Sequence, residues 1–289
     1  MPELPEVETV CRGLNQLTVG QSIEGGEVLH DRSLAYPLSV GAFWEHIAGC
    51  QFHTWQRRGK YLLAQLAKNH QPAGWLGCHL RMTGQLLWVT PREQQSPHTR
   101  IILRCQAGHE LRFVDIRTFG RLWLIPPGVE PAEIMTGLQK LGPEPFAEKF
   151  TPDYLYQKLH KSRRPLKTAL LDQSLVAGLG NIYADEVLFG SGFHPTTLAD
   201  RLSLQDCQKL HHQIQHILKT AIAAGGTSFS DYRQVTGING NYGGIAQVYG
   251  RKGEPCRQCG TTIEKIKLAG RSSHFCPRCQ PLNNNINSY

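Results

Sequence analysis

The chain has 289 residues, and its 31 lysines and arginines outnumber 23 acidic residues to give a formal charge of +8. No apolar run approaches the roughly 18 residues of a membrane span, and the N-terminus lacks the basic-then-apolar pattern of a signal peptide. Nine cysteines in an unexported chain indicate a reducing compartment, with thiols free or bound to metal. We therefore expect a cytoplasmic protein without a membrane partner, whose basic surface attracts polyanions.

The first half of the chain is predicted to form a helix followed by an antiparallel β-sandwich. Apolar residues at helical spacing predict a helix over 3–17, ended by Gly20. One further helix is expected at 41–49. Short apolar or alternating runs predict strands at 50–58, 60–66, 74–80, 85–90, 99–105, 109–115 and 120–126. Many short strands without intervening helices favour an antiparallel sandwich, assigned to 1–130.

The second half is predicted to be helical, which makes the chain a multidomain α+β protein. Five prolines break the chain before residue 147, and we assign 131–150 to a linker. Helical segments are expected within 151–225, and a loop rich in Gly, Asn and Tyr completes a domain over 151–248. A cysteine-containing module follows at 249–281, and residues 282–289 form a frayed tail.

Four cysteines near the C-terminus have the spacing of a structural zinc site. Two C-x2-C pairs are separated by 16 residues: Cys256, Cys259, Cys276 and Cys279. Each pair can direct two thiolates at one ion, and four thiolates close a tetrahedron without an open position for substrate. A disulfide framework is the alternative, and the missing export signal disfavours it. The module predicts one structural zinc ion on a small basic hairpin.

Basic and glycine-rich stretches in the helical part predict contacts with phosphate. Residues 160–171 carry four cations: Lys161, Arg163, Arg164 and Lys167. Residues 177–186 follow, with two glycines before a new helix and with Asn181 placed to cap it or to donate a hydrogen bond. Exposed amides at a helix N-terminus bind phosphate well. Helix, basic turn, glycine turn and helix together favour binding of the DNA backbone.

Three loop tips in the β-rich half carry side chains suited to distorted DNA. Lys60 lies between a glycine and a strand. His79 and Met82 follow another strand, and Arg117 and Phe119 follow a third. Apolar side chains beside arginine can enter a base stack and fill the gap left by an extruded nucleotide. The ordinary alternative is that such apolar residues pack in a small hydrophobic cluster beside the main core.

Seven stretches in order resemble the formamidopyrimidine-DNA glycosylase family over residues 2 to 279. They are PELPEVET, RRGKYLL, HLRMTG, DIRTFGRL, GLGNIYADE, VYGRKGEPC and GRSSHFCPRCQ. The resemblance implies an N-terminal β-sandwich, a helix–two-turn–helix domain and a C-terminal zinc finger. It also implies a base-excision enzyme acting on double-stranded DNA that contains oxidised purines or abasic sites, which we expect at the nucleoid. No exposed apolar heptad indicates a dimer, so we expect a monomer.

The resemblance implies an amine mechanism at the N-terminus. Removal of Met1 exposes the secondary amine of Pro2, which attacks C1′ of the deoxyribose and leaves an iminium, a Schiff base. Glu3 matches the proton donor for sugar-ring opening, and Glu6 is a second acidic residue near the site. Lys60 matches the proton donor of β-elimination, and Arg271 the residue of δ-elimination, which is physically a phosphate clamp.

The remaining matched positions are implied DNA contacts. They are His79, Met82, His98, Arg117, Phe119, Arg163, Lys167, Asn181 and Tyr249. Among them Met82, Arg117 and Phe119 fill the gap and face the orphaned base. The chain departs from the family at TGINGNYGGIAQVYGR, the loop expected to close over the flipped base, which resembles a cyanobacterial and plant-like variant.

Two other functions fit parts of the same pattern. An endonuclease VIII-like enzyme for oxidised pyrimidines shares the amine chemistry, but Leu4 in place of glycine favours the purine enzyme. A non-enzymatic zinc-finger DNA-binding protein would also be basic. In such a protein Pro2, Glu3 and Lys60 would be dispensable.

Overall fold

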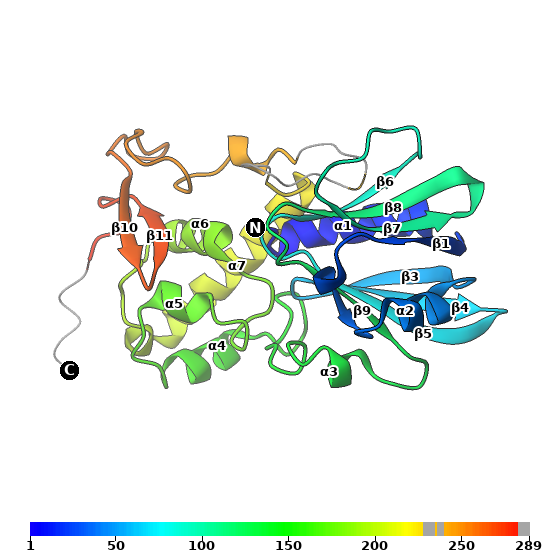
Figure 1. Cartoon of the computed structure of the whole chain (residues 1–289). Helices are drawn as coiled ribbons and strands as arrows, with labels where there is room; N and C mark the ends of the chain where they lie inside the picture. Colours follow the sequence, from blue (N-terminus) through cyan, green and yellow to red (C-terminus); the bar gives the residue numbers. More distant parts are fainter. Residues whose placement is uncertain (228–234, 236–239, 283–289) are drawn as a thin grey trace. The chain divides into compact units, whose positions relative to one another are not determined.

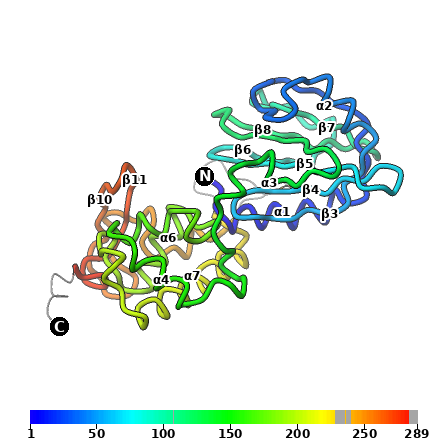
Figure 2. The backbone as a smooth tube through the Cα atoms, turned by 90° about the horizontal axis from the view of Figure 1, so that it is seen from below, coloured from blue at the N-terminus to red at the C-terminus, as the bar shows by residue number. Residues whose placement is uncertain are grey.

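The computed structural model describes residues 1–227, 235 and 240–282. Part of the expected lesion-recognition loop and nearly all of the tail predicted at 282–289 lie outside the described residues. The chain divides into two compact units, which Figures 1 and 2 show in two views. Unit 1 comprises Met1–Lys140 with the described part of Ile222–Gly243, and unit 2 comprises Leu141–Ala221 with the described residues from Gly244 onward.

Unit 1 contains two sheets. The five-stranded sheet has the order β2 (Leu34–Tyr36), β9 (Arg121–Ile125), β5 (Gln71–His79), β4 (Tyr61–Lys68) and β3 (Gln51–Arg58). The four-stranded sheet has the order β1 (Ile23–Val28), β7 (Thr99–Cys105), β8 (His109–Asp115) and β6 (Gly84–Val89). Their strand pairs are antiparallel except β2 with β9, which is parallel. Apolar side chains from both sheets share one core.

Helix α1 (Leu4–Thr18) covers part of that core and contacts β3 (Figure 1). Its buried face consists of Leu4, Val7, Val10 and Leu14, as the helical spacing predicts. Pro5 suits the first turn because a proline there forfeits no intrahelical hydrogen bond. The remaining helical elements of unit 1 are short: η1 (Asp31–Ser33), α2 (Val40–Ile47), η2 (Gln106–Gly108), α3 (Pro131–Ile134) and most of η4 (Tyr242–Gly244).

Unit 2 is helical and ends in a hairpin. Its helices are α4 (Pro152–Leu159), α5 (Leu166–Leu170), α6 (Asn181–Ser191), η3 (Ala199–Arg201) and most of α7 (Leu204–Ala223). Strands β10 (Glu264–Leu268) and β11 (Arg271–Phe275) form an antiparallel pair. In Figure 1 this hairpin stands beside α6, and α6 and β11 are in contact.

The predicted fold class is confirmed: β-sandwich, helical domain and terminal zinc-finger hairpin. Each strand predicted individually is present within a few residues. The stretch at 166–192 is two helices, α5 and α6, because a glycine turn interrupts it and Gly178 has φ +92°. Among the described residues, no helix is both long and apolar enough to cross a membrane.

Candidate active site and DNA-binding residues

The first residues of the chain form the N-terminal end of α1. Pro2 is buried, Glu3 is the N-cap residue with 1% exposure, and Met1 is 42% exposed. While Met1 is present the nitrogen of Pro2 belongs to a peptide bond, so a Pro2 amine exists only after Met1 is removed. The site therefore offers a carboxylate next to a latent secondary amine.

Glu6 connects this end of the chain to a distant segment of unit 1. Its Oε2 accepts a hydrogen bond of 2.8 Å from the backbone N–H of Glu3, and its Oε1 accepts one of 2.7 Å from the N–H of Thr227. Gly226 has φ +78°, and a Cβ there would lie 2.9 Å from Oε1. Glu6 thus binds the root of the expected recognition loop as well as the N-terminus.

Lys60 lies at the tip of the β3–β4 hairpin. Arg58 pairs with Tyr61, so Gly59 and Lys60 are the two turn residues, and Gly59 has φ +56°. Lys60 therefore lies at a loop tip, between a glycine and a strand as the sequence indicates, and it is only 8% exposed.

His79 ends β5 as a neutral histidine. Burial, followed by the charges of Arg81 and Lys60, lowers its pKa to about 3. Its Nδ1 accepts a 3.0 Å hydrogen bond from the N–H of Arg81, which places the ring proton on Nε2. Its ring packs edge-on to Tyr61 with centroids 4.5 Å apart. Near neutral pH it can therefore donate one hydrogen bond but supplies no charge.

The Met82 turn and the Arg117–Phe119 turn meet through Asp115. Thr83 donates to Oδ1 of Asp115, while Oδ2 of Asp115 accepts from the N–H of Gly120 at 2.7 Å. Asp115 is fully buried, whereas Met82 is 40% and Phe119 48% exposed. These two exposed side chains sit on turns after β5 and β8, which belong to different sheets.

Arg117 and His98 lie beside the same aspartate. The Arg117 guanidinium sits 4.9 Å from the centre of the Phe119 ring, a cation–π contact. The backbone N–H of Asp115 donates to the carbonyl of His98 at 2.9 Å. Unit 1 therefore gathers an arginine, a histidine and two apolar side chains around a buried carboxylate.

In unit 2 the glycine turn before α6 is ordered by Gln173. Its side chain donates to the carbonyls of Leu171 and Leu179 and accepts from the N–H of Gly178. Gly180 is the N-cap, and Asn181 is the first helical residue, so Asn181 does not cap the helix. Asn181 Oδ1 is buried and has no hydrogen-bond partner in the described part of the chain.

Two of the four cations in the basic stretch, Arg163 and Lys167, were predicted to contact DNA, and they have opposite environments. The side chain of Arg163 is 94% exposed and lies 3.9 Å from Asp200, so it remains available to a phosphate. Lys167 is 1% exposed, and its ammonium donates to Asp185 at 2.5 Å and to the carbonyl of Ser272 at 2.8 Å. The prediction that Lys167 contacts DNA is therefore wrong, because its charge is neutralised inside unit 2.

Arg271 is the exposed first residue of β11, at the tip of the β10–β11 hairpin. It pairs with Leu268 across a turn in which Ala269 and Gly270 have φ of +47° and +77°. Tyr249 is half-buried, and its N–H donates to Glu186, which also accepts from the N–H groups of Gln247 and Val248. Burial raises the pKa of Glu186 even though these three amides oppose the shift.

The four predicted zinc ligands converge. Their sulfur atoms all lie within 4.8 Å of one another, with Cys256–Cys279 at 3.9 Å and Cys259–Cys276 at 3.5 Å. A tetrahedral ion with Zn–S bonds of about 2.3 Å needs sulfurs about 3.8 Å apart, so the four thiolates fit zinc. Backbone N–H groups of Gln258 and Cys279 point at the sulfurs of Cys256 and Cys276. These four residues hold one structural zinc ion.

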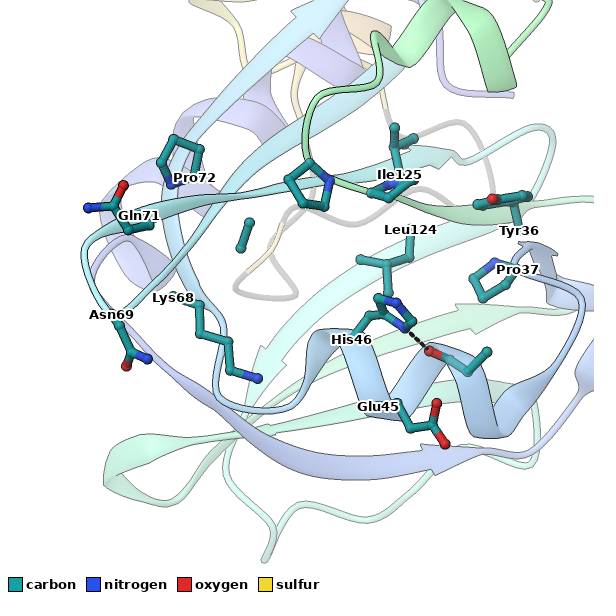
Figure 3. A pocket seen from close by; sticks show the side chains of 14 residues that line it. Tyr36, Pro37, Glu45, His46, Lys68, Asn69, Gln71, Pro72, Leu124 and Ile125 are labelled. Carbon is teal, nitrogen blue, oxygen red and sulfur yellow. Dashed lines mark hydrogen bonds between the residues drawn. The ribbon is translucent and has the colours of Figure 1, made fainter.

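A cavity of about 670 Å³ lies in unit 1 away from these residues (Figure 3). Leu124 and Ile125 line it together with several prolines, and His46 and Lys68 contribute polar atoms. Lys68 ends β4 while Lys60 precedes it, which separates the two by the length of the strand, roughly 25 Å. The cavity therefore does not belong to the site around Lys60 and His79.

The site residues are distributed over both units. Unit 1 carries the N-terminal residues, Lys60, His79, His98 and the two loop tips, and unit 2 carries Arg163, Asn181, Tyr249, Arg271 and the zinc ligands. Sequence reasoning missed the buried acids Asp115, Asp185 and Glu186. Each stands inside a quoted motif, but most of its hydrogen-bond partners lie far away in the sequence, where no local pattern reveals them.

Family models match the chain in three places. The formamidopyrimidine-DNA glycosylase N-terminal domain matches residues 1–122, and the corresponding H2TH domain matches residues 141–233. A zinc finger found in FPG and IleRS matches residues 253–282. Together these models account for most of the chain.

Full-length relatives and solved structures agree with the family models. A formamidopyrimidine-DNA glycosylase of Synechocystis sp. is 70% identical over 97% of this chain and 99% of its own length. One from Rippkaea orientalis is 62% identical over 97% of this chain and 100% of its own length. A Lactococcus lactis FPG mutant in complex with a Fapy-dG containing DNA is 38% identical, with a TM-score of 0.88, covering 97% and 100% of the two chains.

Proposed function

Because the chain belongs to the formamidopyrimidine-DNA glycosylase family, we propose that its N-terminal proline is the nucleophile of a base-excision reaction. The protein is a DNA glycosylase and abasic-site lyase that removes oxidised purines from DNA. The observation that supports the proposal most directly is the position of Pro2 beside Glu3 at the start of α1.

The Pro2 amine suits attack at neutral pH. An α-amino group has a reference pKa near 8, below about 10.4 for lysine, so more of it is unprotonated. Its nitrogen forms a bond to C1′ of the deoxyribose while the glycosidic bond breaks, and the electron pair leaves with the damaged base. Cleavage of the C1′–O4′ bond then gives the iminium, and Glu3 supplies the proton to O4′.

The iminium is an electron sink that drives strand cleavage. It acidifies C2′, so a proton leaves C2′ and the 3′ phosphate departs by β-elimination, assisted by Lys60. A proton then leaves C4′ and the 5′ phosphate departs by δ-elimination, with Arg271 holding phosphate through charge-assisted hydrogen bonds. Hydrolysis of the remaining iminium releases Pro2.

The other predicted residues have roles in binding DNA. Arg163 and Arg117 offer cations to phosphate, and neutral His79 offers one N–H donor. Met82 and Phe119, with Arg117, fill the space of the extruded nucleotide. The four cysteines leave zinc no free coordination position, so the metal stabilises the hairpin that carries Arg271 and takes no part in bond breaking.

The identity of the first residue tests the mechanism. We compare protein with a verified Pro2 terminus and protein that retains Met1, using duplex DNA that contains 8-oxoguanine and borohydride to reduce the iminium. The Pro2 form should yield a covalent adduct, whereas the Met1 form should bind the same duplex without one. A trapped adduct from protein shown to retain Met1 would refute the amine mechanism.

A second experiment tests substrate class. Excision of 8-oxoguanine opposite cytosine should exceed excision of thymine glycol, because relatives at 62–70% identity are formamidopyrimidine-DNA glycosylases. The reverse preference would favour the endonuclease VIII-like alternative. Absence of both activities, with DNA binding unaffected by replacement of Pro2 and Glu3, would favour a non-enzymatic DNA-binding protein.

A further inference from the structure

We propose that Lys167 and Asp185 form a positioning pair that sets Arg271 for phosphate contact, although neither residue touches DNA. The inference rests on the proposed function of Arg271. It assigns a role to the cation that the sequence placed wrongly on the DNA-binding surface, and it concerns unit 2 alone.

Asp185, on helix α6, forms hydrogen bonds with strand β11. Its Oδ2 accepts from the backbone N–H of His274 at 3.0 Å and from the His274 ring at 3.1 Å. Its Oδ1 accepts from Lys167. Asp185 has no solvent exposure and Lys167 has 1%, so water cannot replace these contacts.

Lys167 forms a hydrogen bond with the same strand two residues nearer the hairpin tip. Its ammonium donates to the carbonyl of Ser272 as well as to Asp185. Arg271 pairs with Leu268 next to the hairpin turn, so its own backbone groups face β10. The backbone groups of Ser272 and His274 then face outward, and the two charged side chains bind that outer edge.

This arrangement determines where the hairpin tip lies. A two-stranded hairpin is only marginally stable alone, and its exposed edge has no neighbouring strand to align it. Here one carboxylate from α6 and one ammonium from α5 align the strand, and Arg271 directly precedes Ser272. The position of Arg271 along the strand axis therefore depends on α5 and α6 as well as on the zinc ligands.

A buried ion pair is an expensive way to stabilise a fold, because both charges lose hydration and an apolar pair of similar size often serves as well. Here the ion pair contributes hydrogen bonds of defined direction. The ammonium and carboxylate offer hydrogen bonds at defined angles to two backbone groups, and apolar side chains would let β11 slide.

The test separates the second elimination from the steps before it. Zinc-loaded, full-length protein without Met1 acts on an end-labelled duplex with one abasic site, and gel electrophoresis separates the β- from the δ-elimination product. Lys167→Met keeps the side-chain volume and removes the tether to Ser272. We expect the rate of δ-elimination to fall about tenfold or more, since small displacements of a catalytic group are costly. Borohydride trapping, which reports Pro2, should change less than about twofold.

A double-mutant cycle shows whether the effect passes through Arg271. Lys167→Met should add nothing to Arg271→Gln, because the tether has no purpose once the guanidinium is gone. Leu155→Ala, which opens a cavity at a buried position of α4 in the same unit, is the control for general loosening and should leave the product ratio unchanged. If Lys167→Met fails to fold, the variant Lys167→Met/Asp185→Asn removes both charges and keeps an oxygen for the His274 N–H.

Three outcomes would overturn the inference. A wild-type product ratio in zinc-retaining Lys167→Met would do so while leaving the role of Arg271 intact. Additive effects of Lys167→Met and Arg271→Gln would show that the lysine acts elsewhere. Unchanged δ-elimination in Arg271→Gln would remove the proposed role of Arg271 and the inference together.

Discussion

The hydroxyl of Thr83 donates a 2.5 Å hydrogen bond to Asp115 and accepts a 3.1 Å hydrogen bond from the backbone N–H of Arg117. One small side chain thereby joins the turn that carries Met82 to the turn that carries Arg117 and Phe119. Strand pairing also holds the two turns near each other, because Gly84 pairs with Asp115 and His79 pairs with Arg121. Thr83 adds a direct side-chain link between the turns themselves.

Thr83→Val should weaken the link between the two turns. Valine has nearly the same shape but leaves Asp115 without one donor, so we expect the free energy of unfolding to fall by about 1–3 kcal/mol. Affinity for a duplex with an abasic site should fall as well, because the side chains that enter the gap lose their alignment. Urea unfolding and DNA titration measure the two effects. Thr90→Val, at an exposed hydroxyl, is the control and should change neither.

His79 should make stability depend on pH. Its pKa is about 3 in the folded state and near 6.5 in the unfolded chain, so between these values the unfolded state binds more protons. The contribution is complete above pH 6.5 and is lost as pH falls toward 3, at up to about 1.4 kcal/mol per pH unit. Denaturant unfolding at several pH values measures this slope.

A comparison of two histidine variants isolates the contribution of His79. In His79→Gln, the free energy of unfolding should depend less on pH between pH 4 and 6 than it does in the parent protein. His53→Gln, at an exposed position, should retain it. An equal slope in all three proteins would mean that other groups carry the effect.

Removal of zinc should loosen one end of the chain only. The cysteines form a small cluster with Phe189, Val248 and Ile263, separate from the core of unit 1. After chelation, or in Cys276→Ser, we expect faster amide exchange over 253–280 and weaker DNA binding, with unchanged protection in β3–β5. Loss of protection throughout unit 1 would contradict this expectation.

Gly226→Ala should cost more than a comparable glycine replacement. Both Gly226 and Gly20 have positive φ, +78° and +84°, but a Cβ at Gly226 meets Glu6 at 2.9 Å whereas one at Gly20 meets nothing within 4 Å. Gly20→Ala should lose about 1 kcal/mol of stability from backbone strain alone. In Gly226→Ala we expect a larger loss of stability than in Gly20→Ala, and slower base excision. The difference in stability between the two variants measures the contact with Glu6. Equal stability and activity in both variants would show that this contact has no consequence.

Local patterns predicted much of the fold. The spacing of Val7, Val10 and Leu14 predicted α1, and C-x2-C spacing predicted the metal site, because both depend on residues close in sequence. Strands β1 and β2 were not identified individually. β1 contains Gly25 and Gly26, and β2 is three residues long and pairs in parallel with β9, so neither carries a strong strand pattern.

Long-range contacts account for the error at Lys167. Basic residues near a glycine turn favour DNA binding, and that pattern does fit Arg163. The partners of Lys167 lie 18 and 105 residues away, at Asp185 and Ser272, and only the packing of α5, α6 and β11 brings them together. The sequence shows that a cation is present but not which way it faces.

The carboxylate of Glu6 couples the N-terminal end of α1 to the segment at Thr227. Its two oxygens belong to one rigid group, so the N-terminal end of α1 and the segment at Thr227 cannot shift independently without breaking a hydrogen bond. A movement that draws Thr227 away leaves either that amide or the Glu3 amide without its acceptor. The position of the N-terminus and the position of Thr227 are thus coupled through one side chain.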